Sequence, residues 1–341
     1  MEHPRLDVPG SAAFNDTQLY FQCNSMLSME MVLWEWPNGY QSEATRSWKV
    51  FPHDPRALTV LDLYERIAEY RKRQLKYTSG RYEAFQGILQ NFLQMDDPVK
   101  SLYGLPLEGG TLSISTNSEL LQVALCWASN RRATRNTLFP SWTWVGWEAI
   151  ANDLGDHEMD PYIITYPIGP MWAFFRIKTS VEFGDGTQMP FEKRYDDILK
   201  QSSISAPPPC LVISGTVVDF YLSGYSTNAH HQMTELSPLP PGWSSAAYFD
   251  HHDIGRPGGL RLFLGLMIMV GDYFSKDAIV VLLLAAKDSS TYERIGLGKL
   301  ILPKMEIAEQ CRLVTSPTSI NGLSNARKQT VRIVQNLNPR F

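Results

Sequence analysis

A short segment crowded with tryptophan constrains this chain more than any other. Residues 139–147 read Phe-Pro-Ser-Trp-Thr-Trp-Val-Gly-Trp. Tryptophan is costly to expose, and its indole N–H needs an acceptor when it is buried. Trp142 and Trp144 stand at alternate positions, which predicts a strand over 141–147 with both rings on one face and the hydroxyl side chains on the other. We therefore expect a core strand at this point of the chain.

Beyond the tryptophans, β-rich runs recur between clusters of turn residues. Leu260–Val270 and Ala278–Ala286 are apolar, but each is shorter than the roughly 20 residues that span a bilayer, and a polar turn separates them. With Tyr292–Leu302 they are expected to form consecutive antiparallel strands of one sheet, because their connections are short enough for hairpins. The region 223–259, rich in Gly, Pro, His and Ser, is predicted to form long surface loops. Further strands are predicted over 171–181, 210–222 and 328–334.

The first part of the chain shows helical rather than strand periodicity. Apolar residues at i, i+4 and i+7 predict a helix over about 59–73, with Thr59 at its N-cap. Similar stripes predict helices over about 81–93 and 118–129. Residues 17–23 alternate as a short strand does.

These patterns together predict the α+β class and two domains. An N-terminal helical layer with a short strand is expected over residues 1–135, and a β-rich domain, either a sandwich or an open barrel, over residues 136–341. A chain of 341 residues has room for both.

The composition is that of an ordinary globular protein, with 44% hydrophobic and 19% charged residues. The net charge of −4 and the shortness of the basic runs argue against a nucleic-acid partner, which would favour a basic face. Four widely spaced cysteines without a Cys-x-x-Cys pair indicate reduced thiols and a cytoplasmic location. Residues 1–14 carry charges and prolines where a signal peptide needs an apolar run, so we expect neither a signal peptide nor a membrane span.

Several residues suggest chemistry, but each has a simpler structural interpretation. The histidine pairs at 230–231 and 251–252 offer metal ligands, yet adjacent residues of an extended chain point to opposite sides, so we expect polar loops without a metal. The Gly296–Lys299 run lacks the spacing of a phosphate loop and continues a β pattern. Cys126 lies in the apolar stripe of the predicted third helix, where burial is expected rather than nucleophilic reactivity.

The remaining candidates are also expected to be structural. The acidic pairs at 96–97 and 196–197 flank breaks in the pattern and are interpreted as solvated loop charges. Trp34, Trp36 and Trp48 are expected to cover the helical layer. The chain has no Gly-x-Ser-x-Gly elbow of an α/β hydrolase. We therefore predict no catalytic, cofactor-binding or metal-ligating residues, and no cofactor.

Ordered segments of the chain resemble fungal heterokaryon-incompatibility (HET) proteins. Residues 14–23 are similar to a strand late in the HET domain, and residues 63–73 to the helix that follows it. The Phe-Pro-Ser-Trp-Thr-Trp run at 139–144 resembles the "PSWSW" signature of that family, and Glu-Arg-Ile-Gly-Leu-Gly at 293–298 resembles its "YRIGLG" strand. Further similar segments, in the family's order, lie at 82–88, 103–106 and 120–127.

One part of the family's pattern is missing. HET domains normally begin with an α/β region that carries a "W.D..CI.Q" motif and an "R.WT.QE" motif, and neither occurs in this sequence. The chain is therefore similar to a HET protein that lacks the N-terminal part of the HET domain. A truncated gene model and a naturally short protein are both compatible with this pattern.

The resemblance implies a function in fungal non-self recognition, in which HET proteins trigger programmed cell death after incompatible hyphae fuse. The chain would be a regulatory or partner-contact portion that binds another protein and is not an enzyme. HET domains are thought to be distantly similar to TIR domains, some of which cleave NAD, but such a site would lie in the missing upstream region. The alternative is a hydrolase that uses the histidine-containing loop over 225–256. Histidines and acids that converge in a pocket would favour this enzyme, and dispersed histidines would favour the interaction protein.

Overall fold

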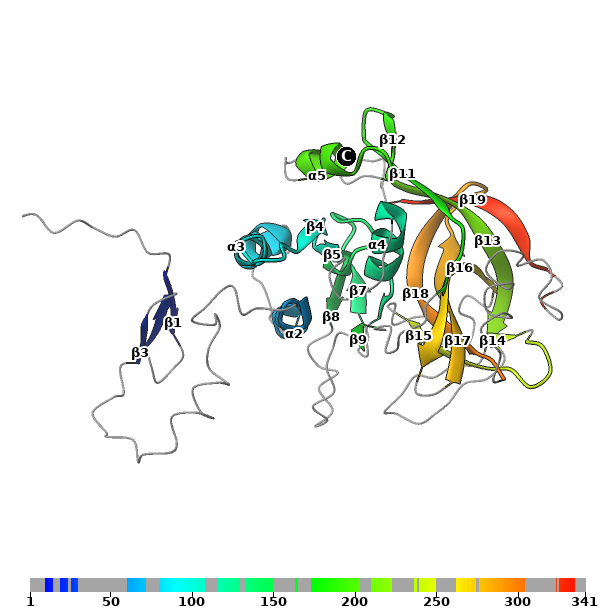
Figure 1. The fold of residues 1–341 in the computed structure, drawn as a ribbon, viewed down its shortest axis with the longest axis horizontal. Coiled ribbons are helices and arrows are strands. Elements are labelled where there is room, and N and C mark those ends of the chain that lie inside the picture. Colours follow the sequence, from blue (N-terminus) through cyan, green and yellow to red (C-terminus); the bar gives the residue numbers. More distant parts are fainter. Residues whose placement is uncertain are drawn as a thin grey trace, which may run out of the picture.

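A computed structural model describes residues 10–14, 19–23, 26–29, 60–71, 80–107, 116–128, 133–149, 163–164, 173–202, 210–222, 236–237, 239–249, 262–273, 276–303, 323 and 325–334. The fold is of the predicted α+β class (Figure 1). Helices and small hairpins lie on one side of the large β-sheet.

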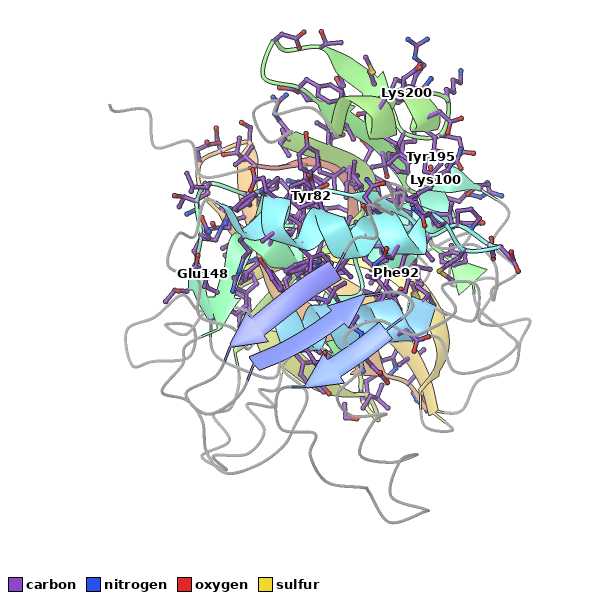
Figure 2. All side chains as sticks on the ribbon, turned by 90° about the vertical axis from the view of Figure 1, so that its left-hand side faces the viewer. Tyr82, Phe92, Lys100, Glu148, Tyr195 and Lys200 are labelled. Atoms are coloured by element: carbon purple, nitrogen blue, oxygen red, sulfur yellow. The ribbon has the colours of Figure 1, made fainter. Side chains whose placement is uncertain are left out.

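The two predicted N-terminal helices are confirmed. Helix α2 spans Val60–Arg71 and helix α3 spans Arg81–Phe92. Each has an apolar stripe that is turned into the core, with Leu63 and Ile67 of α2 and Phe85 of α3 fully buried. Figure 2 views this layer from its outer side, with α3 running across the middle of the view. The expected cap at position 59 lies outside the described residues.

The third helix is shorter than its sequence pattern predicts. Helix α4 spans Asn117–Ala124 and begins at a capping box, in which Thr116 accepts a hydrogen bond from the Glu119 amide and the Glu119 carboxylate accepts one from the Thr116 amide. The prediction over 118–129 is wrong beyond Ala124, where the chain turns and continues as strand β6, Trp127–Ala128. The apolar stripe continues through this turn because the residues after the helix are buried as well.

Small antiparallel pairs complete the N-terminal part. Strands β1 (Gly10–Phe14), β2 (Leu19–Cys23) and β3 (Met26–Met29) form one sheet, and β2 confirms the strand predicted over 17–23. Strands β4 and β5 form a hairpin, as do β7 and β8, while β6 pairs with β9. Their bounds are Lys100–Leu102 for β4, Leu105–Leu107 for β5, Ala133–Arg135 for β7, Trp147–Ala149 for β8 and Ile163–Ile164 for β9.

Five long strands close into a ring. Strands β16, β17 and β18 pair antiparallel in chain order, which confirms the predicted succession of hairpins. Strand β18 pairs in parallel with β19, β19 pairs antiparallel with β13, and β13 returns to β16. The β-rich part is thus a closed ring of strands. The bounds are Cys210–Leu222 for β13, Leu262–Tyr273 for β16, Lys276–Ala286 for β17, Thr291–Ile301 for β18 and Arg327–Ile333 for β19.

Shorter elements border the ring. The strand predicted over 171–181 is in fact two, because β10 (Ala173–Phe174) pairs with β16 and β11 (Lys178–Glu182) pairs with β13. Strand β11 continues into β12 (Gln188–Pro190) and helix α5 (Tyr195–Ser202).

Two strands lie within the region predicted as loops. They are β14 (Leu236–Ser237) and β15 (Ser244–Phe249), which pair with β13 and β18. The loop prediction over 223–259 is therefore wrong at these positions. The serines and alanines of β15 have weak β-propensity, so the pairing with β18 decides its structure.

The two faces of the ring pack differently. One face of the strands carries the smaller hydrophobic cluster, and there Phe220 fills the space that a Cβ on Gly265 would need, at 2.4 Å. The other face joins a larger cluster shared with the helices. That larger cluster includes buried side chains from both sides of residue 135, and the two-domain division at this residue stays a prediction. No helix in the described ranges has the length and apolar character needed to cross a membrane.

One hairpin turn of the ring is expected to make stability depend on pH. The Asp288 carboxylate accepts hydrogen bonds from the Ser290 and Thr291 amides at 2.8 Å, and the bonds from Thr291 and Ser290 lower its pKa from 3.8 to about 2. A lowered carboxyl pKa stabilises the folded state above the unfolded pKa, and this contribution is lost as the pH falls toward the folded pKa.

Asp288→Ala is therefore expected to destabilise the chain at neutral pH, and the difference from wild type should shrink between pH 3.8 and about 2. Urea unfolding at both ends of this range measures the effect, with Asp96→Ala as the control because Asp96 is exposed in the turn after α3. A difference that stays constant down to the lower pH would refute this assignment.

Candidate functional site

The tryptophan segment forms the loop of the β7–β8 hairpin instead of a strand. Thr143 precedes a 3-10 helix, η3, at Trp144–Gly146, and the Gly146 amide donates to the Thr143 carbonyl at 3.1 Å. The chain folds back so closely that a Cβ on Gly146 would lie 2.4 Å from the Pro140 carbonyl oxygen. The strand predicted over 141–147 is therefore wrong, although the expected burial of Trp142 and Trp144 is confirmed, with both fully buried.

Most of the buried indole N–H groups in and beside the loop donate to backbone carbonyls. Trp144 donates its indole N–H to the Gly104 carbonyl at 2.8 Å, and Trp147 donates to the Ser141 carbonyl at 2.8 Å. Trp127, from strand β6, donates to the Trp142 carbonyl at 3.0 Å. Three of the four buried indoles thus keep a hydrogen bond, whereas the Trp142 Nε1 has no acceptor among the described residues.

The β4–β5 turn contacts the tryptophan loop on the side that faces the helices. Tyr103 and Gly104 have φ angles of 49° and 86°, as a two-residue hairpin turn of type I′ requires. Their carbonyls face the loop, and Thr143 donates its hydroxyl to the Tyr103 carbonyl at 2.7 Å. The Tyr103 ring meets Trp142 edge-on, with centroids 6.1 Å apart.

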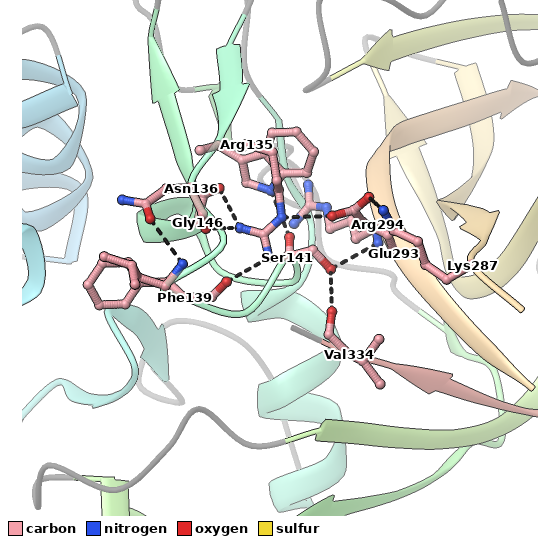
Figure 3. Close-up of polar contacts among 11 residues, drawn as sticks. Arg135, Asn136, Phe139, Ser141, Gly146, Lys287, Glu293, Arg294 and Val334 are labelled. Carbon is pink, nitrogen blue, oxygen red and sulfur yellow. Dashed lines mark hydrogen bonds and ion pairs between the residues drawn. The ribbon is translucent and has the colours of Figure 1, made fainter. Parts of the chain in front are cut away.

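Arg135 organises the loop from within (Figure 3). Its Nη1 donates to the Gly146 carbonyl at 2.8 Å and also to the Asn136 carbonyl, and its Nη2 donates to the Phe139 carbonyl at 2.6 Å. Its Nε donates to Glu293 Oε1 on β18 at 2.8 Å. The planar, rigid guanidinium suits this task because it presents several donors in fixed directions.

Glu293 and Ser141 carry the contact to the ring of strands. Glu293 also pairs with Lys287 at 2.7 Å, and its carboxylate is 8% exposed. Ser141 accepts a hydrogen bond from the Arg294 amide at 3.0 Å and donates its hydroxyl to the Val334 carbonyl at 3.3 Å. The loop therefore bonds to β18 and to the residue just after β19, and Figure 3 shows these contacts converging on Ser141 and Arg135.

Buried positive charge surrounds the junction between the loop and β18. The Arg294 guanidinium lies over the Trp127 ring, 3.5 Å from its centroid, and donates to the Trp142 and Trp127 carbonyls. Burial lowers the pKa of Arg135, an effect that Glu293 opposes. Burial also lowers the pKa of Lys299, farther along β18, to about 8.

The polar side-chain atoms of Ser141 and Glu293 are already used in contacts between the loop and β18. The oxygen of Ser141 is engaged by an amide and a carbonyl, and the carboxylate of Glu293 by two cations. The arrangement can hold the loop against β18, and it sets no nucleophile beside a base as covalent catalysis would need. We name the contacts of Arg135, Ser141, Glu293 and Arg294 the loop–strand junction.

Cys126 is the one candidate nucleophile of the sequence whose surroundings the structure describes fully. It lies in the turn after α4, not in the helix, and its Sγ donates to the Gln122 carbonyl at 3.2 Å. Burial raises the pKa of its thiol to about 12, which leaves it protonated at neutral pH. The expected burial is thus confirmed.

Cys126 is expected to resist alkylation in the folded chain. Iodoacetamide should label it only after denaturation, because reaction requires both access and the thiolate. Peptide mapping by mass spectrometry, with and without urea, measures this. Rapid labelling of Cys126 under native conditions would show that the thiol is accessible and reactive.

The other candidates from the sequence lie apart from the junction. Gly296–Lys299 lies inside β18, as its β pattern predicts. The acidic pair at 96–97 is exposed in a turn, whereas the pair at 196–197 lies in the first turn of α5, so its placement in a loop is wrong. Acidic residues favour the first turn of a helix through the helix dipole, a signal that could have revealed α5. Lys100 pairs with Asp196 at 3.1 Å beside Tyr195 (Figure 2).

The histidine pairs at 230–231 and 251–252, and Trp34, Trp36 and Trp48, lie outside the described residues. Within the described ranges, no group of three or more His, Cys, Asp and Glu side chains is placed to hold a metal ion. The hydrolase alternative depends on the histidine loop and stays a prediction.

Sequence reasoning missed Arg135 as a central residue of the junction. One signal existed for its partner, because Glu293 and Arg294 are adjacent charged residues within a predicted core strand, and buried charges need partners. Comparisons of the chain with profiles of protein families, with curated proteins and with solved structures found no match.

Proposed function

We propose that this chain is the regulatory or partner-contact portion of a fungal non-self recognition protein of the HET type, linked to programmed cell death and non-catalytic as it stands. Its partner would be another protein. One observation carries the proposal. Two of the segments that resemble HET proteins, at 139–144 and 293–298, contact each other at the loop–strand junction.

This contact supports the proposal because it gives the shared motifs a physical role. Ser141 and Trp142 of the first segment bond to Arg294 of the second. Arg135, just before the first segment, pairs with Glu293 at 2.8 Å, and the side chains are 7% and 8% exposed.

A genetic confrontation tests the proposal. Deleting the gene in its host and pairing the deletion strain with genetically different strains should abolish cell death in at least one incompatible pairing. Reintroducing the wild-type gene should restore it, as should Leu138→Ala, which changes an exposed side chain of the same loop. Unchanged cell death in every pairing would contradict a role in non-self recognition.

A biochemical measurement tests the non-catalytic part separately. The purified chain is expected to turn over NAD no faster than a heat-denatured control. Turnover above that control would show that the chain is an enzyme, whatever the result of the genetic confrontation.

A further inference from the structure

We propose that one face of strands β11, β13 and β19 binds an oxyanion of the phosphate class. The site comprises Lys178, Ser214, Thr216, Lys328 and Thr330. We name it the lysine–hydroxyl patch. It lies on the ring of strands, away from the loop–strand junction, and does not depend on the proposed function.

Strand register brings these residues together. Lys178 of β11 stands directly opposite Ser214 of β13, which stands opposite Thr330 of β19. In the next row on the same face, Thr216 stands opposite Lys328. Residues opposite one another in antiparallel strands point to the same side, and so do residues two apart along a strand. All five side chains therefore share one face.

The chemistry of the patch suits an anion. An ammonium group carries three donors and no acceptor, and a hydroxyl can donate as well. Lys178 and Lys328 are exposed, and neither has an ion-pair partner among the described residues. Glu182, on the same face of β11 as Lys178, is paired with Arg332. The patch therefore carries two positive charges that neighbouring side chains do not neutralise.

The hydroxyls supply an independent indication of a ligand. The Ser214 and Thr330 hydroxyl oxygens lie 2.5 Å apart, so one donates to the other and the acceptor keeps its own hydrogen for a further bond. Thr216 is fully buried, and its hydroxyl has no hydrogen-bond partner within the described part of the chain. An unpaired buried hydroxyl costs free energy, and a ligand oxygen at this position would supply its missing partner.

The dimensions agree with a small oxyanion. Neighbouring strands lie about 4.8 Å apart, so Lys178 and Lys328 flank β13 from strands about 10 Å apart. Lysine side chains are long and flexible enough to reach a common point above β13 from both sides. A phosphate there would accept from both ammonium groups and from the hydroxyls between them.

Isothermal titration of the full chain with inorganic phosphate, at constant ionic strength, tests the proposal. Saturable binding is expected, and Lys178→Gln combined with Lys328→Gln should weaken it by at least about tenfold. The matched control is Lys193→Gln combined with Lys200→Gln, which removes the same charge from exposed positions near α5 and should leave binding nearly unchanged. Absence of saturable binding, or equal weakening in the two double variants, would overturn the proposal.

Two further titrations sharpen the test. Thr216→Val keeps the shape of the side chain without its hydroxyl and should weaken phosphate binding, whereas unchanged affinity would overturn the site as defined.

Phenyl phosphate in a parallel titration distinguishes the source of the ligand. Tighter binding of the ester assigns the patch to a phosphorylated ligand, and tighter binding of the inorganic ion assigns it to free phosphate. Circular dichroism confirms that each variant is folded.

Discussion

Trp144→Ala is expected to lower the free energy of unfolding by about 3–5 kcal/mol, the range for deleting a large buried aromatic side chain. The ring is fully buried and meets Phe85 edge-on, with centroids 5.0 Å apart. It also meets Tyr70 edge-on at 6.1 Å. Truncation would leave a cavity between the loop and the helical layer, and it would remove the donor to the Gly104 carbonyl.

Urea unfolding followed by tryptophan fluorescence and circular dichroism measures this loss. Leu138→Ala is the matched control, because Leu138 belongs to the same loop but is 50% exposed, and its truncation should change stability by less than about 0.5 kcal/mol. Similar effects of the two substitutions would show that the indole of Trp144 does not anchor the loop.

Arg135→Ala is expected to destabilise the chain by a similar amount, about 3–5 kcal/mol, as is typical when one partner of a buried ion pair is removed. The substitution takes the fork of donors away from the loop carbonyls. It also leaves Glu293 buried with Lys287 as its remaining cation. Both effects arise because the pair is largely shielded from water, with side chains 7% and 8% exposed.

A double-mutant cycle separates the pair from the rest of the loop. Arg135→Ala and Glu293→Gln, alone and together, should give a coupling free energy of about 0.5–3 kcal/mol, because the residues are in direct contact. Arg66→Ala provides the control, since its pair with Glu69 is more exposed and should be worth less than about 1 kcal/mol. Additive effects of the two junction substitutions would mean that the pair does not hold the loop to β18.

Regular elements of this fold follow from sequence periodicity, and irregular ones do not. The apolar stripes of α2 and α3 and the fully apolar runs of β16 and β17 each repeat one pattern, so elements of the right type were predicted there within a few residues. The tryptophan segment repeats a strand pattern only by coincidence. Its indoles are buried from both the helical side and the sheet side, so alternation carries no information about the backbone.

The loop–strand junction was beyond sequence reasoning for a different reason. Arg135 and Glu293 are separated by 158 positions, and nothing local indicates that one is the partner of the other. Both charges are buried only because the hairpin loop packs against β18, and this tertiary contact leaves no trace in the local sequence. The small-residue strand β15 was missed because it forms on its partner strand rather than by its own propensity.

Amide hydrogen exchange in wild type and Arg135→Ala tests most directly the claim that the loop–strand junction joins the helical layer to the ring of strands. In wild type, the amides of Phe85 in α3 and Val281 in β17 should exchange with the same opening free energy, as parts of one cooperative unit. In Arg135→Ala, the amide of Phe85 should exchange faster, while that of Val281 should keep more of its protection because Val281 packs in the smaller cluster and not in the one shared with the helices. Unequal opening in wild type, together with no change on substitution, would contradict the account.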